Sequence, residues 1–299
     1  MEDTLLEVRD LQVEFSTKMG IVRVLDKVNL KVDPRQTVGI IGESGCGKSM
    51  MALSIMGLVP IPPGRIAGGE ILYRGTDLLT LEKDAILDIR GKRIAMIFQE
   101  PMNSLNPVFT VGNQLVETLL RHEDMTRRDA WDKSVDMLKA VGIPSPEKRM
   151  HDYSFQMSGG MRQRVMIAMS LCLDPDILIA DEPTTALDVT VQAQILDLLR
   201  EMQDRVGASI IMITHDLGVV AEVSDKVAVL YAGRKVEEGS VEQILFNPQH
   251  PYTKALKGCI PHLQRTPTSG RHRLHEIPGM VLGMAELGKD RCSFYERCP

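Results

Sequence analysis

The sequence predicts an α/β fold in which a parallel sheet is interrupted by a helical insertion. Three observations lead to this prediction: apolar segments of strand length alternate with helical segments, a glycine-rich turn separates one such strand from the next helix, and a charged helical stretch divides the alternation into two runs. Of the 299 residues, 43% are hydrophobic and 25% are charged, an ordinary globular composition that excludes general disorder.

The N-terminal third combines two kinds of strand. Residues 5–15, 22–32 and 66–73 alternate between apolar and polar side chains, so we expect antiparallel strands there. Residues 37–41 form a short apolar strand instead, which a glycine-rich turn joins to an apolar helix over about residues 48–58. We therefore expect an antiparallel β subdomain in addition to the parallel sheet.

The rest of the chain adds the helical insertion and the second run of strands. Residues 110–154 are helical and charged in pattern, and after about residue 239 the chain is rich in proline and loops. Strands that alternate with helices indicate parallel pairing. The expected strands lie at residues 93–98, 177–180, 209–214 and 226–231, and the expected helices at residues 163–173, 190–205 and 217–223.

Charge and cysteine content exclude several classes of protein. Lys and Arg total 35 and Asp and Glu total 40, and the net charge of −5 argues against a sequence-wide basic surface for nucleic acid. The five cysteines are an odd, scattered set, unlike a secreted disulfide framework. The N-terminus lacks the basic start of a signal peptide, and the longest uncharged apolar stretch, residues 49–64, is too short to span a bilayer. We therefore expect a cytosolic chain that reaches a membrane only through a partner.

A phosphate-binding loop is predicted at residues 42–49, GESGCGKS, between an expected strand and an expected helix. Its glycines let backbone N–H groups curl around nucleotide phosphates, and the helix N-terminus favours their negative charge. Lys48 would neutralise phosphate oxygens, and the Ser49 hydroxyl would ligate Mg²⁺. The strand–loop–helix context argues against the alternative, an accidental glycine turn.

Four polar residues follow expected strands. Asp181 and Glu182 end an apolar strand, and carboxylates at the C-terminal edge of a parallel sheet face the ligand crevice. Asp181 suits a water-mediated hold on Mg²⁺, and Glu182 could polarise a water for attack on the γ-phosphate. His215 could hydrogen-bond the γ-phosphate, and Gln99 ends another strand. The alternative for each residue is an ordinary strand-end side chain.

A second cradle is predicted at residues 158–164, SGGMRQR, where small residues open a helix. One chain rarely needs two phosphate cradles for one nucleotide, so the second cradle makes sense if it serves the nucleotide of a partner chain. With these motifs in this order, the sequence resembles the ATP-binding subunits of ABC transporters over nearly its whole length. The resemblance implies a RecA-like P-loop core with an antiparallel β subdomain, an inserted helical subdomain and a short C-terminal extension.

The resemblance also implies domain boundaries and residue roles. It places an ABC ATPase domain at residues 1–240, with its helical subdomain at about 100–160, and the extension at residues 241–299. The cofactors it implies are ATP and Mg²⁺. Residues 157–161, MSGGM, match the signature motif of the family, which usually reads LSGGQ. The implied catalytic residues are Glu182, His215 and Gln99; the implied nucleotide-binding residues are Phe15, Gly42, Glu43, Ser44, Gly45, Cys46, Gly47, Lys48, Ser49, Met50, Asp181, Ser158, Gly159, Gly160 and Asp188; and the implied Mg²⁺ ligands are Ser49, Gln99 and Asp181.

Two further stretches narrow the resemblance to the dipeptide, oligopeptide and nickel importer group: residues 99–107, QEPMNSLNP, and residues 247–256, NPQHPYTKAL. They imply a subunit that hydrolyses ATP to power peptide import at the cytoplasmic face of a membrane, with nickel or glutathione as alternative cargo. The implied partners are a second ABC ATPase subunit, a paralogue, two transmembrane permease subunits and an external peptide-binding protein, with no nucleic acid. The rival functions are a soluble ABC ATPase acting on nucleic acid or ribosomes, and an unrelated P-loop kinase or GTPase.

The C-terminal residues contain two cysteines, Cys292 and Cys298, with five residues between them. In the importer group this element resembles the start of a cysteine cluster, which implies a 4Fe–4S centre built from four ligands. Cys259 could be a third ligand. The alternative to a cluster is two unliganded thiols in a tail. Because the sequence ends one residue after Cys298, a truncated form would explain the incomplete set of ligands.

Overall fold

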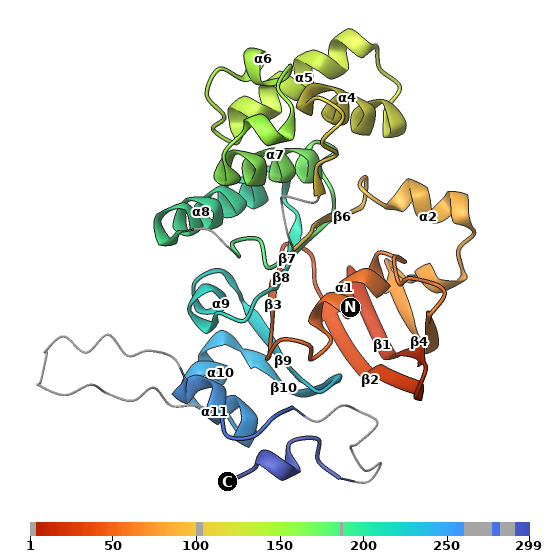
Figure 1. Ribbon diagram of the computed structural model, residues 1–299, viewed down its shortest axis with the longest axis vertical. Coiled ribbons are helices and arrows are strands. Elements are labelled where there is room, and N and C mark those ends of the chain that lie inside the picture. The colour runs from red at the N-terminus through yellow and green to blue at the C-terminus, as the bar shows by residue number, and fades with distance from the viewer. Residues whose placement is uncertain (1–3, 100–103, 186–187, 260–276, 282–290) are drawn as a thin grey trace, which may run out of the picture. The chain divides into compact units, whose positions relative to one another are not determined.

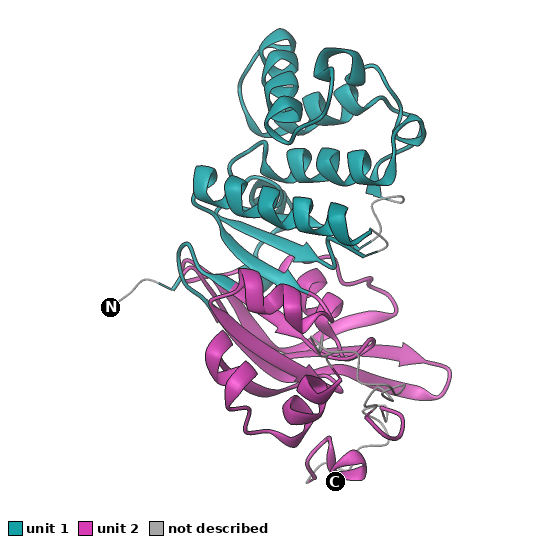
Figure 2. Cartoon of the chain, turned by 90° about the vertical axis from the view of Figure 1, so that its left-hand side faces the viewer, with its two compact units in different colours: residues 1–4, 32–37, 78–213 teal, residues 5–31, 38–77, 214–299 magenta. Residues whose placement is uncertain are grey.

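The computed structural model describes residues 4–99, 104–185, 188–259, 277–281 and 291–299 (Figure 1). The chain divides into two compact units (Figure 2). Unit 1 comprises Met1–Thr4, Val32–Thr37 and Leu78–Ile213, and unit 2 comprises Leu5–Lys31, Val38–Asp77 and Thr214–Pro299. In the part of the chain that the structure describes, no helix is long and apolar enough to cross a membrane.

Unit 2 contains a four-stranded antiparallel sheet in the order β2-β1-β4-β5. Strand β1 pairs with β4 from Leu6 opposite Tyr73 to Phe15 opposite Gly64, with register shifts between Arg9 and Val13. At Gly69, on the irregular stretch, the φ angle is +94° and a Cβ would lie 2.6 Å from Leu11 Cα, so glycine permits this close approach. The strands are β1 (Leu6–Thr17), β2 (Gly20–Val32), β4 (Gly64–Tyr73) and β5 (Thr76–Asp77), which confirms the predicted antiparallel subdomain.

Unit 2 also contains the strand that leads into the phosphate loop. Strand β3 (Thr37–Ile41) is entirely buried and pairs in parallel with β9 (Lys226–Tyr231). An antiparallel strand, β10 (Arg234–Ser240), follows β9 through a turn at Ala232 and Gly233, which both have positive φ angles. The helices of this unit are α1 (Lys48–Ile55), α9 (Leu217–Val223), α10 (Val241–Phe246), α11 (Pro251–Gly258) and the short η3 (Tyr295–Arg297).

Unit 1 contains three parallel strands in the order β8-β7-β6. All of their residues are buried, in keeping with the continuous apolar runs from which they were predicted. Helix α7 packs against β6 and against α8. The strands are β6 (Ile94–Ile97), β7 (Ile177–Asp181) and β8 (Ser209–Ile213), and the helices are α7 (Gly159–Leu171) and α8 (Val189–Val206).

The helical insertion of unit 1 lies between β6 and α7 in the sequence, as predicted. Its two long helices begin at threonine caps: Thr110 accepts a hydrogen bond from the Asn113 N–H, and Thr126 accepts one from the Asp129 N–H. Figure 1 shows α4, α5 and α6 gathered together on one side of α7. The remaining described elements of unit 1 are η1 (Leu78–Thr80), α2 (Lys83–Ile89), α4 (Val111–His122), α5 (Arg127–Ala140), α6 (Pro146–Arg149) and η2 (Ser154–Gln156).

Candidate nucleotide-binding site

The phosphate loop lies between β3 and α1 in unit 2, and two of its glycines are sterically required. At Gly42 the φ angle is +153°, and a Cβ would lie 2.2 Å from the carbonyl oxygen of Leu230 on β9. At Gly47 the φ angle is +104°, and a Cβ would lie 2.6 Å from Leu25 Cδ2 on β2. The loop is therefore pressed against two strands in a shape that only glycine allows at these positions.

Lys48 is buried inside this loop, with 5% of its surface exposed. Its Nζ donates hydrogen bonds to the carbonyl oxygens of Gly42, at 2.7 Å, and Glu43, at 3.1 Å. Helix α1 begins at Lys48, and its described first turn contains no acidic residue. An ammonium group and a helix N-terminus thus add positive charge at one place, which fits the phosphates of a nucleotide.

His215 belongs to a segment that runs beside the strand leading into the loop. The N–H of Thr214, the residue before it, donates to the carbonyl oxygen of Ile40 at 3.2 Å, two residues ahead of Gly42. His215 is exposed, and Asp216 caps helix α9 by accepting from the Gly218 N–H at 2.7 Å. The structure therefore brings the backbone at His215, which was predicted to hydrogen-bond the γ-phosphate, close to the start of the loop.

Phe15 lies near the end of β1 and is half-buried. It is paired with Gly64 of β4, and a Cβ at Gly64 would lie 2.9 Å from Phe15 Cζ. The missing side chain at Gly64 thus makes room for the aromatic ring. Stacking of this ring on adenine stays a prediction.

The acidic strand end of unit 1 brings two of the predicted residues together. Asp181 ends β7 and is 2% exposed. Glu182 follows with a φ angle of +47°, and its N–H donates to the Ile213 carbonyl at 2.8 Å. The Gln99 amide, just after β6, donates to Glu182 Oε2 at 3.0 Å. Because β6 and β7 are parallel neighbours, their carboxyl ends meet at one edge, and the side chains meet with them.

Thr185 is a further contact of Glu182 that the sequence analysis missed. Its hydroxyl donates to the same atom, Glu182 Oε2, at 2.8 Å. The turn is closed by a backbone hydrogen bond from the Thr185 N–H to the Glu182 carbonyl at 3.2 Å. A hydroxyl residue three positions after a glutamate at a strand end was the available signal, since such a turn returns the chain to the carboxylate.

The second predicted cradle is the start of helix α7. Ser158 is its N-cap, and the Ser158 hydroxyl accepts a hydrogen bond from the Met161 N–H at 3.3 Å. Ser158 and Gly159 are exposed, and a Cβ at Gly160 would lie 3.3 Å from Val191 Cγ1 of α8. Asp188 caps α8, with its Oδ1 accepting from the Val191 N–H at 3.0 Å. The two residues before Asp188, 186 and 187, lie outside the described residues.

The cysteines have different surroundings. Burial raises the pKa of Cys172 to about 12 and also raises the pKa of Cys46, so both thiols are protonated at neutral pH. Cys292 and Cys298 are exposed, and Cys292 Sγ lies 3.8 Å from His250 Nε2. Among the described residues, no group of three or more His, Cys, Asp or Glu side chains could hold a metal ion. These residues therefore do not supply the four ligands of an iron–sulfur cluster, and that hypothesis stays a prediction.

Comparisons with known proteins identify the family. The ABC transporter family model matches residues 25–185, and the model of the oligopeptide/dipeptide transporter C-terminal region matches residues 236–299. A probable peptide ABC transporter ATP-binding protein, y4tR, of Sinorhizobium fredii is 50% identical over 299 residues, covering 99% of this chain and 88% of that protein. The oligopeptide transport ATP-binding protein OppD of Bacillus subtilis is 51% identical over 275 residues, covering 92% of this chain and 76% of that protein.

Solved structures give the same answer for the fold. The dimeric ATP-binding cassette MJ0796 in a post-hydrolysis state, bound to ADP and Pi, matches with a TM-score of 0.70 and 26% identity, covering 79% of this chain and 98% of that one. The cbiO1 subunit of Clostridium perfringens matches with a TM-score of 0.69 and 27% identity, covering 82% of this chain and 92% of that one. The fold is that of an ATP-binding cassette, as predicted. The chain belongs to the ABC transporter family and is one of its ATPase subunits.

Proposed function

We propose that the chain hydrolyses ATP to power the import of short peptides through a membrane permease. The observation that carries this proposal is the match of residues 236–299 to the oligopeptide/dipeptide transporter C-terminal region, in addition to the ABC transporter match. Two of the similar proteins from Bacillus subtilis are named as oligopeptide and dipeptide transport ATP-binding proteins. Nickel and glutathione remain the alternative cargoes.

In the proposed cycle, the phosphate loop binds ATP. Backbone N–H groups of residues 42–49 receive the phosphates, the Lys48 ammonium balances their charge, and Phe15 stacks on adenine. The loop conformation supports this role, because Gly42 and Gly47 carry no side chain and adopt positive φ angles that let the backbone curl. Lys48 is already held at the loop by its two carbonyl contacts.

Hydrolysis is assigned to the strand-end residues. Glu182 takes a proton from the attacking water, and His215 supports the γ-phosphate. Ser49, Gln99 and Asp181 would hold Mg²⁺, which when bound supplies positive charge to the phosphate oxygens. The two hydrogen bonds to Glu182 Oε2 from Gln99 and Thr185 support the assignment of the base, because they fix the orientation of its carboxylate.

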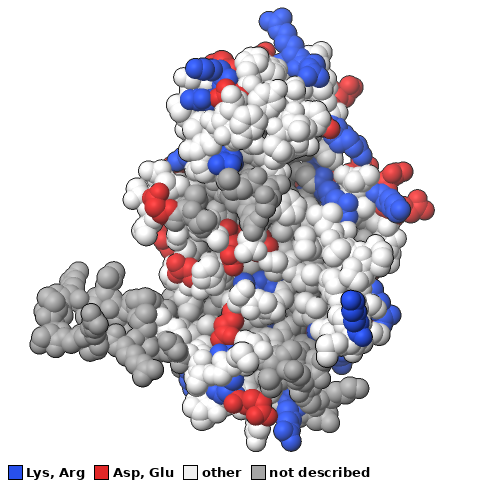
Figure 3. Space-filling model, in the orientation of Figure 1, with Lys and Arg blue, Asp and Glu red and all other residues white. Residues whose placement is uncertain are grey.

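The proposed partners are a second ABC ATPase subunit of paralogous sequence, two permease subunits and an external peptide-binding protein, at the cytoplasmic face of the membrane. The exposed Ser158 and Gly159 at the start of α7 support the ATPase partner, because this helix N-terminus is open to an anion from outside the chain. On the face drawn in Figure 3, basic and acidic side chains of the described residues are interspersed, which does not favour a nucleic-acid partner.

Uptake in cells tests the proposal. Cells that carry Glu182→Gln in place of the natural gene should lose uptake of a labelled dipeptide or oligopeptide and keep normal nickel accumulation and glutathione uptake. Glu201→Gln is the matched control, since Glu201 is exposed on helix α8. Normal peptide uptake by Glu182→Gln cells, with a loss of nickel or glutathione uptake, would overturn the peptide assignment.

A further inference from the structure

The C-terminal extension holds the phosphate loop at Glu43, the residue after Gly42. The Glu43 backbone N–H donates a hydrogen bond to the Tyr252 hydroxyl at 2.8 Å. The Glu43 carboxylate receives a fork of two bonds from Arg297, from Nη1 to Oε2 at 2.9 Å and from Nη2 to Oε1 at 3.2 Å. A bidentate pair of this kind fixes direction as well as distance, so Glu43 is held through both its backbone and its side chain.

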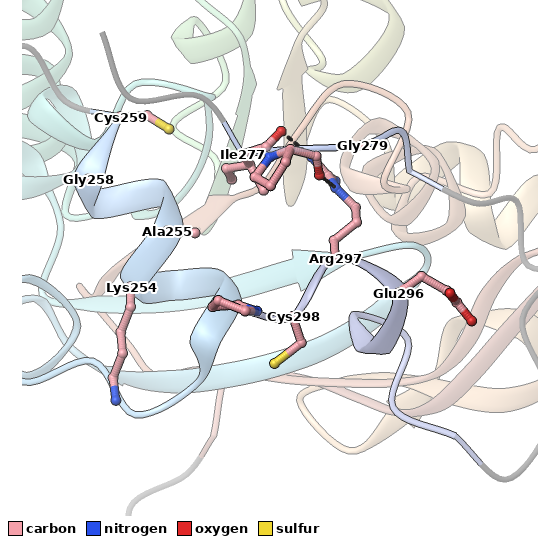
Figure 4. A pocket seen from close by; sticks show the side chains of 11 residues that line it. Lys254, Ala255, Gly258, Cys259, Ile277, Gly279, Glu296, Arg297 and Cys298 are labelled. Atoms are coloured by element: carbon pink, nitrogen blue, oxygen red, sulfur yellow. Dashed lines mark hydrogen bonds between the residues drawn. The ribbon is translucent and has the colours of Figure 1, made fainter. Parts of the chain in front are cut away.

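Arg297 is a buried side chain, with 6% of its surface exposed. Besides Glu43, its Nε donates to the Pro278 carbonyl at 2.9 Å and its Nη2 donates to the Ile277 carbonyl at 3.2 Å (Figure 4). Its Nη1 also donates to the Tyr231 hydroxyl at 3.4 Å. All three guanidinium nitrogens are therefore engaged, and the direction of the fork toward the loop is set by the surrounding extension.

Tyr252 is anchored just as firmly. It is fully buried on α11, and its ring lies 4.6 Å from the Tyr231 ring and 5.4 Å from the Phe294 ring, between centroids. Phe294, three residues before Arg297, is 1% exposed and meets Tyr231 edge-on at 5.2 Å. Burial raises the pKa of Tyr252, so its hydroxyl stays neutral and accepts the Glu43 N–H. These aromatic rings belong to one buried hydrophobic cluster with residues of β9 and with Ile41 of β3, which joins the extension to the core.

Glu43 connects this anchored extension to the residue that would meet phosphate. Its carbonyl oxygen accepts a hydrogen bond from Lys48 Nζ at 3.1 Å. A continuous series of contacts thus runs from Arg297 through Glu43 to Lys48. A shift of Glu43 would move the carbonyl oxygen that accepts from Lys48 Nζ, and with it the backbone next to Gly42.

We propose that Arg297 and Tyr252 are positioning residues of the phosphate loop, so that the C-terminal extension sets the affinity of the loop for Mg-ATP. This inference rests on the proposed role of the loop in binding ATP. It assigns to the extension a function within the ATPase itself, separate from any contact with a permease. Its consequence is that a change more than 200 residues away from the loop in sequence alters nucleotide binding.

The test is an equilibrium titration of Mg-ATP against the full chain and its variants, with the melting temperature measured in parallel. Arg297→Gln should weaken Mg-ATP binding about tenfold. Arg297→Lys should weaken it less, because lysine keeps the positive charge but cannot form the two parallel hydrogen bonds to the Glu43 carboxylate. In a Glu43→Gln background, Arg297→Gln should add little, because the ion pair is already broken. Glu296→Gln is the matched control, since Glu296 is the exposed neighbour of Arg297 and should bind Mg-ATP normally.

A purely structural role for Arg297 would lower the melting temperature and leave the dissociation constant of the folded protein unchanged, and that result overturns the proposal. If Arg297→Gln does not fold, the proposal is tested with Tyr252→Phe, because this variant keeps the buried ring and removes only the hydroxyl that accepts from the Glu43 N–H. Unchanged Mg-ATP affinity in Tyr252→Phe would then contradict the proposal. Unchanged affinity in Lys48→Ala would instead contradict the role of the loop in binding ATP.

Discussion

The phosphate loop of unit 2 and the acidic strand end of unit 1 hold their functional side chains in different ways. Lys48 is buried and donates hydrogen bonds to backbone carbonyls of its own loop. The loop is in turn held at Glu43 by hydrogen bonds with the buried side chains of Arg297 and Tyr252. Glu182 is partly exposed, and its hydrogen bonds with Gln99 and Thr185 join side chains near the surface.

This difference suits the loop to binding ATP and the strand end to catalysing its hydrolysis. A buried group tied to backbone moves little, so the loop is preset for phosphate. Surface hydrogen bonds between side chains rearrange at low cost, which suits a base that must release one partner and take up a water. Variants in the loop should therefore change affinity first, and variants at the strand end should change turnover first.

The largest effect is expected from Lys48→Ala, which removes the ammonium from the loop. It should abolish tight Mg-ATP binding in an equilibrium titration, since the loop loses the ammonium that would balance the phosphate charge. Lys83→Ala is the matched control, because Lys83 is exposed on α2 and the same side chain is removed. An affinity equal to that of the natural chain would remove the phosphate-loop assignment.

Glu182→Gln should act on turnover instead. An amide cannot take a proton from water, so steady-state ATP hydrolysis should be at least about 100-fold slower. The measurement is phosphate release at saturating Mg-ATP, with Glu201→Gln as the control on an exposed glutamate of α8. Near-normal turnover would show that another residue is the base.

A smaller effect is expected from Thr185→Ala. It removes one of the two described donors to Glu182 Oε2, so turnover should fall about fivefold with the Mg-ATP affinity unchanged. Thr190→Ala makes the same substitution at an exposed position of α8 and should leave both turnover and Mg-ATP affinity unchanged. If Thr185→Ala weakens affinity and spares turnover, the division of labour between the two regions is wrong.

Sequence patterns predicted the structural elements that are determined by a few consecutive residues. The buried strands β3, β6, β7 and β8 are continuous apolar runs, and the phosphate loop is a fixed pattern of glycines with one lysine, so each is visible within a few residues. Gln99 and Glu182 were both predicted at strand ends, but their hydrogen bond depends on β6 and β7 being neighbours in the sheet, which no local pattern reveals.

The features that the sequence analysis missed depend on distant partners. Strand β10 is polar, and pairing with β9 rather than apolar alternation holds it in place. The Arg297–Glu43 pair joins residues 254 positions apart, and no local pattern distinguishes this arginine from any other. The division into an ATPase domain of residues 1–240 and an extension of residues 241–299 stays a prediction. The contacts of Tyr252 and Arg297 tie part of that extension closely to the loop.

The most direct test of the separation between binding and catalysis is the Mg-ATP dissociation constant of Glu182→Gln, measured beside that of Lys48→Ala in the same buffer. Glu182→Gln should bind Mg-ATP as tightly as the natural chain, whereas Lys48→Ala should show no tight binding. Equal loss of affinity in both variants would contradict the account, because the acidic strand end would then contribute to binding as much as the loop does.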